Sequence, residues 1–321
     1  MYFILAHMKA VIIGGSGHFE YTLEEANMVE WLGLAPGSPD EDLSRLRASI
    51  DLPAYSNYLA LLDNCSPDIA VINPHFHLNG PVIIECLKRG IHCFAEKPIA
   101  LSTNDLNNIR AELQKETALL APMMIHRYEP WFYAAYKGLM AGMVGTVVQI
   151  QAQKSYKMGA KPKWMRDKAL FGGIIPWVGA HAVDLIHWMS DGGVNLVSAN
   201  QTTFGNMHQG EVESSAMLHF ELANGGQAMA SIDYLRPASA PTHGDDRIRI
   251  VGERGIIEVM HGKAILMNED DKSLELSMED QNSIFGDFIN SIKTQQPARV
   301  TAQDAIAVSE LCITAEEFTK K

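Results

Sequence analysis

The sequence predicts an α/β protein with two domains: a doubly wound parallel sheet, followed by an α+β domain built on an open-faced, mostly antiparallel sheet. Up to about residue 122, apolar β-branched runs alternate with helical patterns, which is the order of repeated βαβ units. From about residue 123, strand patterns follow one another instead. A length of 321 residues exceeds the usual size of one domain and agrees with this division.

The first domain, residues 1–122, opens on the run "KAVIIGGSG", an apolar strand that ends in glycines. The strand begins at about Met8, and the residues before it are left out of the fold prediction. The next stretch, "YTLEEANMVEWLGLAPG", predicts a helix followed by a second strand. "GSPDEDLSRLRAS" predicts another helix, with Ser38 as N-cap, Pro39 at the first position and Glu41 closing a capping box.

Two further strands, "DIAVINP" and "IHCFAE", flank the amphipathic helix "GPVIIECLKRG", which ends at Gly90. Crossovers of this kind are right-handed, so the strands form a parallel sheet. The ligands of such a sheet bind at the carboxyl ends of its strands.

The second domain, residues 123–286, is predicted from a succession of strand patterns: "GTVVQIQAQKSY", "NLVSANQTTFG", "EVESSAMLHFEL", "QAMASIDYL", "RIRIVG", "GIIEVM" and "KAILMN". The stretch "ANGGQ" is typical of a hairpin turn. One helix, near Pro176 to Met189, interrupts the strands. Two amphipathic helices, "SIFGDFINSIK" and "AQDAIAVSELCITAEEF", close the chain, and residues 287–321 are treated as a closing helical segment.

The net charge of the chain argues against two classes of binding partner. The 38 acidic residues against 26 basic ones give a net charge of −12, without long blocks of one sign, which argues against nucleic acid and against an anionic membrane surface. The 4 cysteines show no CxxC spacing and indicate reduced thiols rather than a zinc site. No apolar run is long enough to cross a bilayer and no signal peptide is recognised, so we expect a cytoplasmic protein.

The glycine loop after the first strand predicts a dinucleotide site. Such a site uses glycines for a tight turn and for close approach to a pyrophosphate at a helix start. Gly15 and Gly17 match this pattern, but Glu20 stands where a third glycine is usual and would compete with phosphate. The second strand ends without an acid for the ribose, while Asp40 to Asp42 would repel a 2′-phosphate. NAD and NADP therefore both remain open.

Several longer stretches carry a resemblance. "VINPHFHLNGPVIIECLKRGIHCFAEKPIA" ends in Glu96, Lys97 and Pro98, and resembles the Glu-Lys-Pro segment of the glucose-fructose oxidoreductase and inositol dehydrogenase (Gfo/Idh/MocA) family. "HRYEPWFYAAYKGLMAGMVGTVVQI", "KPKWMRDKALFGG" and "GGIIPWVGAHAVDLIHW" resemble the segments that follow it, in the same order. The resemblance implies a Rossmann domain, an open-faced sheet domain, association through that sheet, and nicotinamide-dependent redox chemistry on sugars, polyols or their derivatives.

Alcohol oxidation by hydride transfer needs a base or hydrogen-bond partner for the hydroxyl group, and Lys97 stands at the carboxyl end of a predicted strand. In the family, a helix carries an acid four residues before a histidine. His181 matches that histidine, but Trp177 stands at the acid's position. His181 thus lacks its usual orienting carboxylate unless Asp184 replaces it from the next turn. Trp177 suits stacking on a sugar ring or on the nicotinamide.

The candidate residues fall into three groups. Lys97 and His181 are the expected catalytic residues. The expected substrate contacts are Trp177, Asp184, Lys154 and Trp164. The expected cofactor contacts are Gly14, Gly15, Ser16, Gly17, His18, Phe19, Ser38, Asn73, Pro74, His77, Glu96, Lys97 and Arg166. No metal site is expected, because no converging ligand cluster accompanies His181 and His187.

Three functions agree with the sequence. The leading one is an NAD(P)-dependent oxidoreductase of a carbohydrate-like hydroxyl or carbonyl substrate. The second is a non-redox sensor or regulatory member of the same fold, which Glu20, the missing ribose acid and Trp177 favour. The third is an NAD-dependent glycosidase or epimerase. A homodimer or homotetramer is also expected, because strands such as "SSAMLHFEL" carry apolar groups on both faces.

Overall fold

The computed structural model of the protein describes residues 7–270 and 272–320. The chain divides into two compact units, and each is built from two stretches of sequence. The first contains the described residues up to Met123 together with Asn282–Ile306, and the second contains the described residues of Met124–Gln281 and of Ala307–Lys321. The segment 287–321 is therefore divided between the two units rather than standing apart from both.

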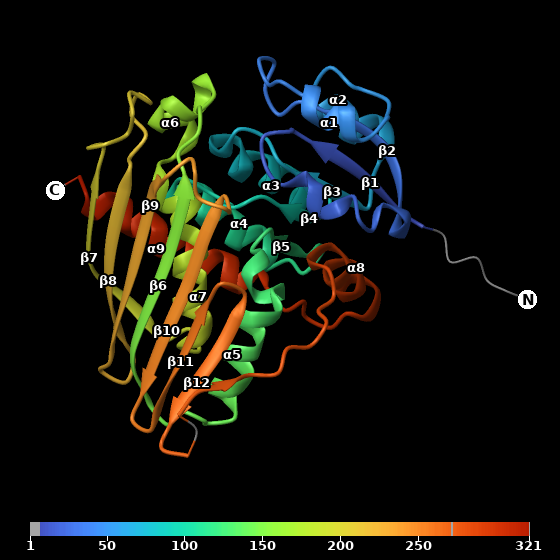
Figure 1. Ribbon diagram of the computed structural model, residues 1–321. Coiled ribbons are helices and arrows are strands. Elements are labelled where there is room, and N and C mark those ends of the chain that lie inside the picture. Colours follow the sequence, from blue (N-terminus) through green and yellow to red (C-terminus); the bar gives the residue numbers. More distant parts are fainter. Residues whose placement is uncertain (1–6, 271, 321) are drawn as a thin grey trace, which may run out of the picture. The chain divides into compact units, whose positions relative to one another are not determined.

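The first unit contains a five-stranded sheet in the order β2-β1-β3-β4-β5, and every pair in it is parallel (Figure 1). Its strands are β1 (Met8–Ile13), β2 (Val29–Ala35), β3 (Ile69–Ile72), β4 (His92–Ala95) and β5 (Leu120–Pro122). Its helices are α1 (Ser44–Ser49), α2 (Tyr58–Cys65), α3 (Asn79–Lys88), α4 (Thr103–Leu113) and α8 (Ile284–Thr294). β3 is buried along its whole length, as the unbroken apolar run "IAVI" requires. The prediction of a parallel α/β sheet is confirmed.

The helix expected directly after the glycine loop is absent, and that prediction is wrong. Two short 3₁₀ turns, η1 (Phe19–Thr22) and η2 (Ala26–Met28), connect β1 to β2 instead. The Thr22 hydroxyl donates to the Phe19 carbonyl and Phe19 is fully buried, while η1 packs against α8. Tertiary packing against a helix from the far end of the chain has overridden the local helical pattern.

The capping box expected at Ser38 is also wrong, because α1 begins only at Ser44. The Ser38 hydroxyl donates to Asp40 Oδ1 (2.7 Å) in an exposed turn rather than capping a helix. Glu41, expected to bond back to the N-cap, instead bonds to the glycine loop. The carboxylate gains two donors from the loop and a third from Gly37 N just beyond β2, whereas a capping box would provide one.

The second unit contains an eight-stranded sheet in the order β13-β12-β11-β10-β6-β9-β8-β7 (Figure 1). The β6–β9 pair is parallel and the other pairs are antiparallel, which confirms the mostly antiparallel prediction. The strands are β6 (Val147–Lys157), β7 (Val194–Thr202), β8 (Ser215–Leu222), β9 (Gln227–Arg236), β10 (Gly244–Gly252), β11 (Gly255–Met260), β12 (Lys263–Asn268) and β13 (Leu274–Glu275). Its helices are α5 (Pro130–Met140), α6 (Lys168–Phe171) and α7 (Ala180–Met189), and α9 (Ala302–Phe318) begins in the first unit and ends in the second.

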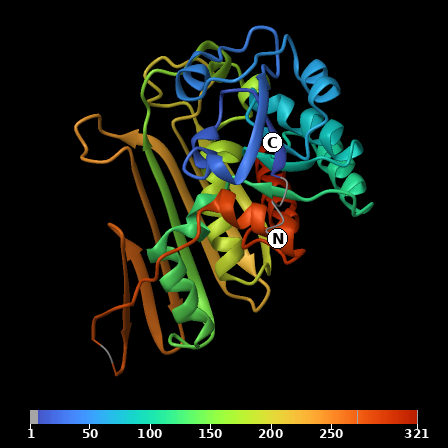
Figure 2. The same ribbon diagram turned by 90° about the vertical axis from the view of Figure 1, so that its right-hand side faces the viewer.

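One face of this sheet is covered by helices. α7 packs on β6 and β9, and α5 packs on β11 and β12; Figure 2 shows α5 lying along the strands. On β8, the residues facing the helices are buried and apolar: Ala216, Leu218, Phe220 and Leu222. The opposite face carries exposed Met217 and Met229 among polar side chains such as Gln149 and Gln151, so it is mixed in character rather than uniformly apolar.

The expectation that no apolar run is long enough to cross a bilayer is wrong by length and composition, because the stretch Lys168–Met189 meets both criteria. However, 83% of its most apolar window is buried inside the protein. It is therefore the kind of stretch that forms the core of a folded α/β protein.

Candidate functional site

The glycine loop of the first unit requires glycine at two positions. Gly14 has a φ of +80°, and a Cβ there would lie 2.3 Å from the backbone N of Pro74. A Cβ on Gly17 would lie 2.5 Å from Asn73 Oδ1 and 2.6 Å from Glu96 Oε2. These distances leave no room for a side chain at either glycine. The loop backbone therefore packs directly against the residues that follow β3 and β4.

A carboxylate lies at this loop that the sequence analysis did not place there. Glu41 Oε1 accepts hydrogen bonds from Gly15 N (3.0 Å) and from the Ser16 hydroxyl (2.6 Å). Its Oε2 accepts from Gly37 N (2.8 Å), just beyond the end of β2. The sequence has no acid at the end of β2. The Glu41 side chain, six residues after the strand, brings a carboxylate to that position instead.

A cation also lies at the loop. The Arg45 guanidinium donates to the carbonyls of Gly15 (3.2 Å) and Gly17, and lies 4.7 Å from the centre of the Phe19 ring. Its Nε is 3.4 Å from Glu20 Oε1. Arg45 therefore offsets the negative charge that Glu20 brings to the loop.

Glu96 connects the loop to Lys97. Its Oε2 accepts from the His18 backbone N–H and approaches the His18 ring Nδ1, both at 2.6 Å. Its Oε1 accepts from Lys97 N (2.9 Å) and lies 3.9 Å from Lys97 Nζ. Burial raises the pKa of Glu96, but the charges of His18 and Lys97 outweigh it, so this pKa lies below its ordinary value. Glu96 is thus a buried anion between the His18 ring and the Lys97 ammonium.

The turn that carries Lys97 is held rigidly. Lys97 is 1% exposed at the carboxyl end of β4, and the Lys97–Pro98 peptide bond is cis. The Asn79 side-chain amide donates to the carbonyls of Glu96 (3.1 Å) and Pro98 (2.8 Å). Two hydrogen bonds from one buried amide therefore fix the backbone on both sides of the lysine.

The first unit offers the groups that a dinucleotide needs. Asn73 is fully buried, and neither its Nδ2 nor its Oδ1 has a hydrogen-bond partner in the described part of the chain. Buried amides are rarely left in this state. Asn73 lies beside Gly17, where the backbone is open to close approach, and His77 Nδ1 nearby in sequence is likewise buried without a partner. A bound dinucleotide would supply acceptors and donors to these groups, so the residues fit it.

In the second unit, His181 stands one turn into a buried helix. The helix begins with a five-residue π-turn, Ile175–Gly179, which contains Trp177. Trp177 is 9% exposed and His181 3%. The His181 ring lies 4.7 Å from the His126 ring, centre to centre, at a 43° tilt. π-Turns occur often at functional sites, and this one ends two residues before the expected catalytic histidine.

His126 belongs to a buried polar chain that comes from three elements. Lys154 Nζ donates to Asp246 Oδ2 (2.6 Å) and to His126 Nε2 (2.8 Å), and His126 Nδ1 lies 2.5 Å from Glu129 Oε2. Because an ammonium has donors only, Nε2 accepts and Nδ1 carries the proton that bonds Glu129. Burial lowers the pKa of Lys154, opposed by the charges of Asp246 and Glu129, and the result lies below its ordinary value.

Asp184 is engaged elsewhere. Its carboxylate accepts from Arg127 Nε (3.1 and 3.2 Å) and Nη2 (2.6 Å), and Arg127 lies over the Trp188 ring at 5.4 Å. Both partners are almost fully buried. The carboxylates of Glu129 and Asp246 lie 2.5 and 3.4 Å from the His126 ring nitrogens, and Asp184 anchors α7 to Arg127.

The remaining expected contacts have partners of their own. Trp164 packs edge-on against Phe171, and Arg166 Nε donates to the Lys161 carbonyl (2.9 Å). Ser38 is in the exposed turn described above. The backbone of Pro74 lies directly against Gly14 of the loop. No group of three or more His, Cys, Asp or Glu side chains within residues 7–270 and 272–320 is placed to hold a metal ion.

A parallel nucleotide-type unit joined to an open-faced sheet unit defines a class of two-unit dinucleotide oxidoreductases, and comparison with known proteins gives the family. Residues 8–123 match the oxidoreductase family with an NAD-binding Rossmann fold, and residues 132–258 match the GFO/IDH/MocA C-terminal domain. The chain belongs to the GFO/IDH/MocA oxidoreductase family.

Individual relatives agree with this placement. A protein of solved structure from Thermotoga maritima is 40% identical, with a TM-score of 0.93 over 98% of each chain. Trans-1,2-dihydrobenzene-1,2-diol dehydrogenase of Xenopus tropicalis is 23% identical over 64% of this chain, and inositol 2-dehydrogenase of Salmonella typhimurium is 21% identical over 57%. The chain spans only 59% and 54% of the length of these two curated relatives.

Proposed function

We propose that the protein is an NAD-dependent oxidoreductase that interconverts a hydroxyl and a carbonyl group on a polyol, sugar or related substrate. The observation that carries the proposal is the position of Glu96, which bonds to the glycine loop through His18 and to Lys97 through the backbone. One buried carboxylate thereby couples the cofactor loop to the ammonium group expected to handle the proton. The dehydrogenase names of two relatives support the same chemistry.

When bound, the dinucleotide supplies the hydride chemistry: it accepts a hydride from a carbinol carbon or returns one to a carbonyl carbon. Asn73, Gly17 and Glu41 would hold it. The neutral amine form of Lys97 would take the hydroxyl proton during oxidation, and its ammonium form would return that proton during reduction. Glu96, an anion beside it, stabilises the ammonium form.

In the second unit, we assign the substrate-binding role to His181 and the polar chain behind it. His126 contacts the His181 ring and is itself bonded to Glu129 and Lys154. Trp177 stands where the family has an acid near this histidine. The carboxylates of the polar chain take the place of that acid near His181. Trp177 then offers an apolar ring for stacking on substrate.

We infer a preference for NAD over NADP. In dinucleotide folds, a carboxylate near the end of the second strand bonds the ribose hydroxyls and repels a 2′-phosphate. Glu41 brings a carboxylate to the end of β2 and to Gly15 together. Arg45 does not offset this preference, because its guanidinium is already engaged by loop carbonyls and Glu20.

The sensor hypothesis retains one specific observation in its favour. Glu20 is paired with Arg45, and Glu41 supplies an acid at the end of β2, so two of its three arguments weaken. Trp177 remains in place of the family's acid. The glycosidase or epimerase alternative gains no particular support from the described residues.

The test uses Lys97→Ala and, as a matched control, Lys88→Ala, which removes a surface lysine from the end of α3. NADH and NAD titrations by fluorescence report binding, and a panel of polyols and sugar derivatives reports turnover. We expect Lys97→Ala to lower turnover by roughly 10² to 10⁴ and to leave dinucleotide affinity nearly unchanged, while Lys88→Ala changes neither. Nucleotide binding without turnover of any panel member would favour the sensor hypothesis.

We also propose a cytoplasmic homo-oligomer that associates through the open face of the second unit's sheet. The free, mostly buried cysteines support a reducing compartment. Exposed Met217 and Met229 on that face support association.

A further inference from the structure

Lys161, in the segment after β6, has an ammonium group that pairs with no acid within residues 7–270 and 272–320. Its backbone is fixed on both sides, because its N–H donates to Gln209 Oε1 (3.1 Å) and its carbonyl accepts from Arg166 Nε (2.9 Å). Its Nζ lies 3.8 Å from the centre of the Tyr234 ring. No acceptor among the residues that the structure describes bonds to this Nζ. Desolvation lowers the pKa of Lys161 to about 8.

Tyr234 is a second polar group without a partner at the same place. The residue is 1% exposed, and in the described part of the chain its hydroxyl has no hydrogen-bond partner. Burial raises the pKa of Tyr234 well above its ordinary value, assisted by Tyr156 and by the charge of Glu213, so the hydroxyl remains a donor. Glu213 does not accept from this hydroxyl; its oxygens accept from Lys168 and from Ile174 N.

Ammonium groups outnumber carboxylates among the charges that act on the neighbouring His243. The His243 ring packs on Tyr156 at 4.7 Å. Burial lowers the pKa of His243, and the charges of Lys161, Lys157 and Lys154 lower it further, with Asp246 opposing them. Three ammonium groups therefore act on one ring, although the chain as a whole carries a net charge of −12.

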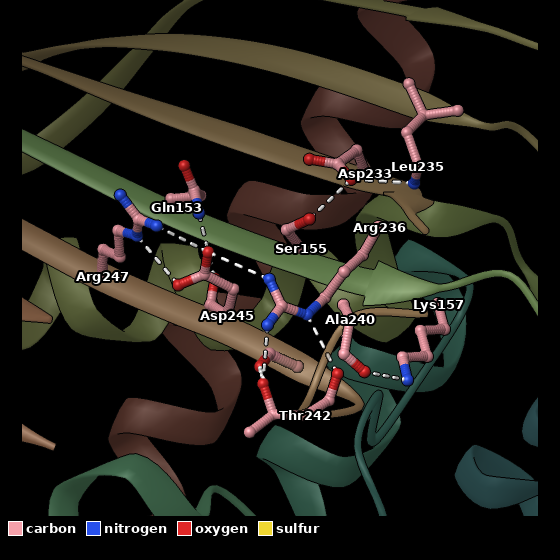
Figure 3. Close-up of polar contacts among 11 residues, drawn as sticks. Gln153, Ser155, Lys157, Asp233, Leu235, Arg236, Ala240, Thr242, Asp245 and Arg247 are labelled. Atoms are coloured by element: carbon pink, nitrogen blue, oxygen red, sulfur yellow. Dashed lines mark hydrogen bonds and ion pairs between the residues drawn. The ribbon is translucent and has the colours of Figure 1, made fainter. Parts of the chain in front are cut away.

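The acids on the neighbouring strands are already engaged. Figure 3 shows Asp245 accepting from Arg236 (3.2 Å) and from Arg247 (2.7 and 2.8 Å). In the same view, Asp233 accepts from a hydroxyl and a backbone N–H, and Lys157 donates to a backbone carbonyl rather than to an acid. These carboxylates therefore leave Lys161 unneutralised.

We propose that Lys161 and the Tyr234 hydroxyl form a subsite for an anionic group, a carboxylate or a phosphate, carried by the substrate. Both groups are donors that lack an acceptor, and an anionic oxygen accepts from both. A neutral hydroxyl would gain far less from the Lys161 ammonium. Because the Tyr234 hydroxyl is covered, binding requires the Lys161 ammonium to leave the ring face and turn toward the anion, which its flexible stem allows. The inference rests on the proposed function only in calling the ligand a substrate.

The test is equilibrium binding by calorimetry, with and without NADH, of three probes that differ in charge. D-Glucuronate carries a carboxylate, D-glucose 6-phosphate a phosphate, and D-glucose neither. We expect at least one anionic probe to bind about tenfold or more tightly than glucose, the value of one hydrogen bond to a charged group. The stronger of the two anionic probes identifies the group.

The variants separate a subsite from loop packing. Lys161→Met should remove the preference for the anionic probe, and Lys163→Met, an exposed lysine of the same segment, should retain it. Tyr234→Phe removes only the hydroxyl; it should lower anion affinity by about tenfold and leave the melting temperature unchanged or higher, since no hydrogen bond is lost.

The pH dependence of anion affinity is a further test, because a purely structural role of Lys161 in packing would not produce it. Affinity for the anion should fall as the pH rises above about 8, where the Lys161 ammonium deprotonates, and Lys161→Arg should abolish that fall. Equal affinity for all three probes, or an anion preference that survives Lys161→Met, would overturn the proposal. Probe binding does not depend on turnover, so a failure of the oxidoreductase assignment would be seen separately in the nucleotide titrations.

Discussion

Replacing Glu41 by glutamine should change which dinucleotide the protein prefers. Glutamine keeps the size of the side chain but loses its charge, and one of its two terminal groups becomes a donor. In the protein, both oxygens of Glu41 accept: one from Gly15 N and the Ser16 hydroxyl, the other from Gly37 N. Whichever way the amide turns, its NH₂ group faces a backbone N–H, so at least one hydrogen bond is lost.

The size of the effect follows from those contacts. A hydrogen bond to a charged group contributes roughly 1.5 to 3 kcal/mol, or about a tenfold to 150-fold change in an equilibrium constant. If Glu41 bonds the ribose hydroxyls, NAD affinity should fall by about tenfold or more. NADP affinity should fall less or rise, because the repulsion of its 2′-phosphate is removed. The NAD to NADP affinity ratio should therefore shrink, and by about tenfold or more where NADP affinity is unchanged or rises.

Fluorescence titration with NADH and NADPH on the same preparations measures this ratio directly. Glu20→Gln is the control, because Glu20 also lies near the loop but is exposed and paired with Arg45. We expect that control to leave the ratio nearly unchanged. An unaltered ratio in Glu41→Gln, with the protein folded and still binding NADH, would refute the assignment of Glu41 to the ribose.

Three further predictions concern the second unit. Arg127→Met should lower the free energy of unfolding by about 3 to 5 kcal/mol, because it leaves Asp184 as a buried, unpaired carboxylate. Urea titration measures this difference. A loss below about 1 kcal/mol would mean that water solvates the pair. Burial raises the pKa of Glu129, but its interactions with the His126 ring and with the Lys154 ammonium outweigh burial, so this pKa lies below its ordinary value and the carboxylate stabilises the fold above about pH 4. Glu129→Gln should therefore be less stable than the parent at pH 7, with the difference closing as the pH falls; a difference that persists in acid would contradict the pairing. Light scattering at micromolar concentration should give a dimer or tetramer, and Met217→Lys should dissociate it, whereas a monomeric parent would rule out association through this face.

The regular elements could be predicted from the sequence because their signals are local. Most strands of both sheets appear where apolar runs or alternation indicate them, although β5 and β13 were not expected. α3 and α8 follow their amphipathic patterns, whereas α9 forms as a helix without a marked apolar face in its sequence. The helix expected after Gly17 failed because packing against α8, more than 250 residues away in sequence, decided that segment. Local propensity contains no information about such a contact.

The candidate site was harder to predict than the fold. Lys154 was expected as a substrate contact, but its partners His126 and Asp246 lie 28 and 92 residues away in sequence, and only the tertiary structure brings them together. One signal was available: strand alternation places Lys154 on the same face as buried residues two and four positions before it. A lysine on the inward face of a strand needs a partner, and the sequence shows that need without showing which residues meet it.

The division of the chain has a consequence for synthesis on the ribosome. The sheet of the first unit is complete by residue 122, yet Phe285 and Phe288 of α8 contribute rings that pack at 5.3 and 5.5 Å against Phe94 of β4. Those rings emerge only after the whole eight-stranded sheet has been translated. The nascent nucleotide-type unit therefore waits with an apolar surface exposed while the second unit is made. We expect this interval, rather than the finished protein, to be the stage most exposed to aggregation and most dependent on chaperones.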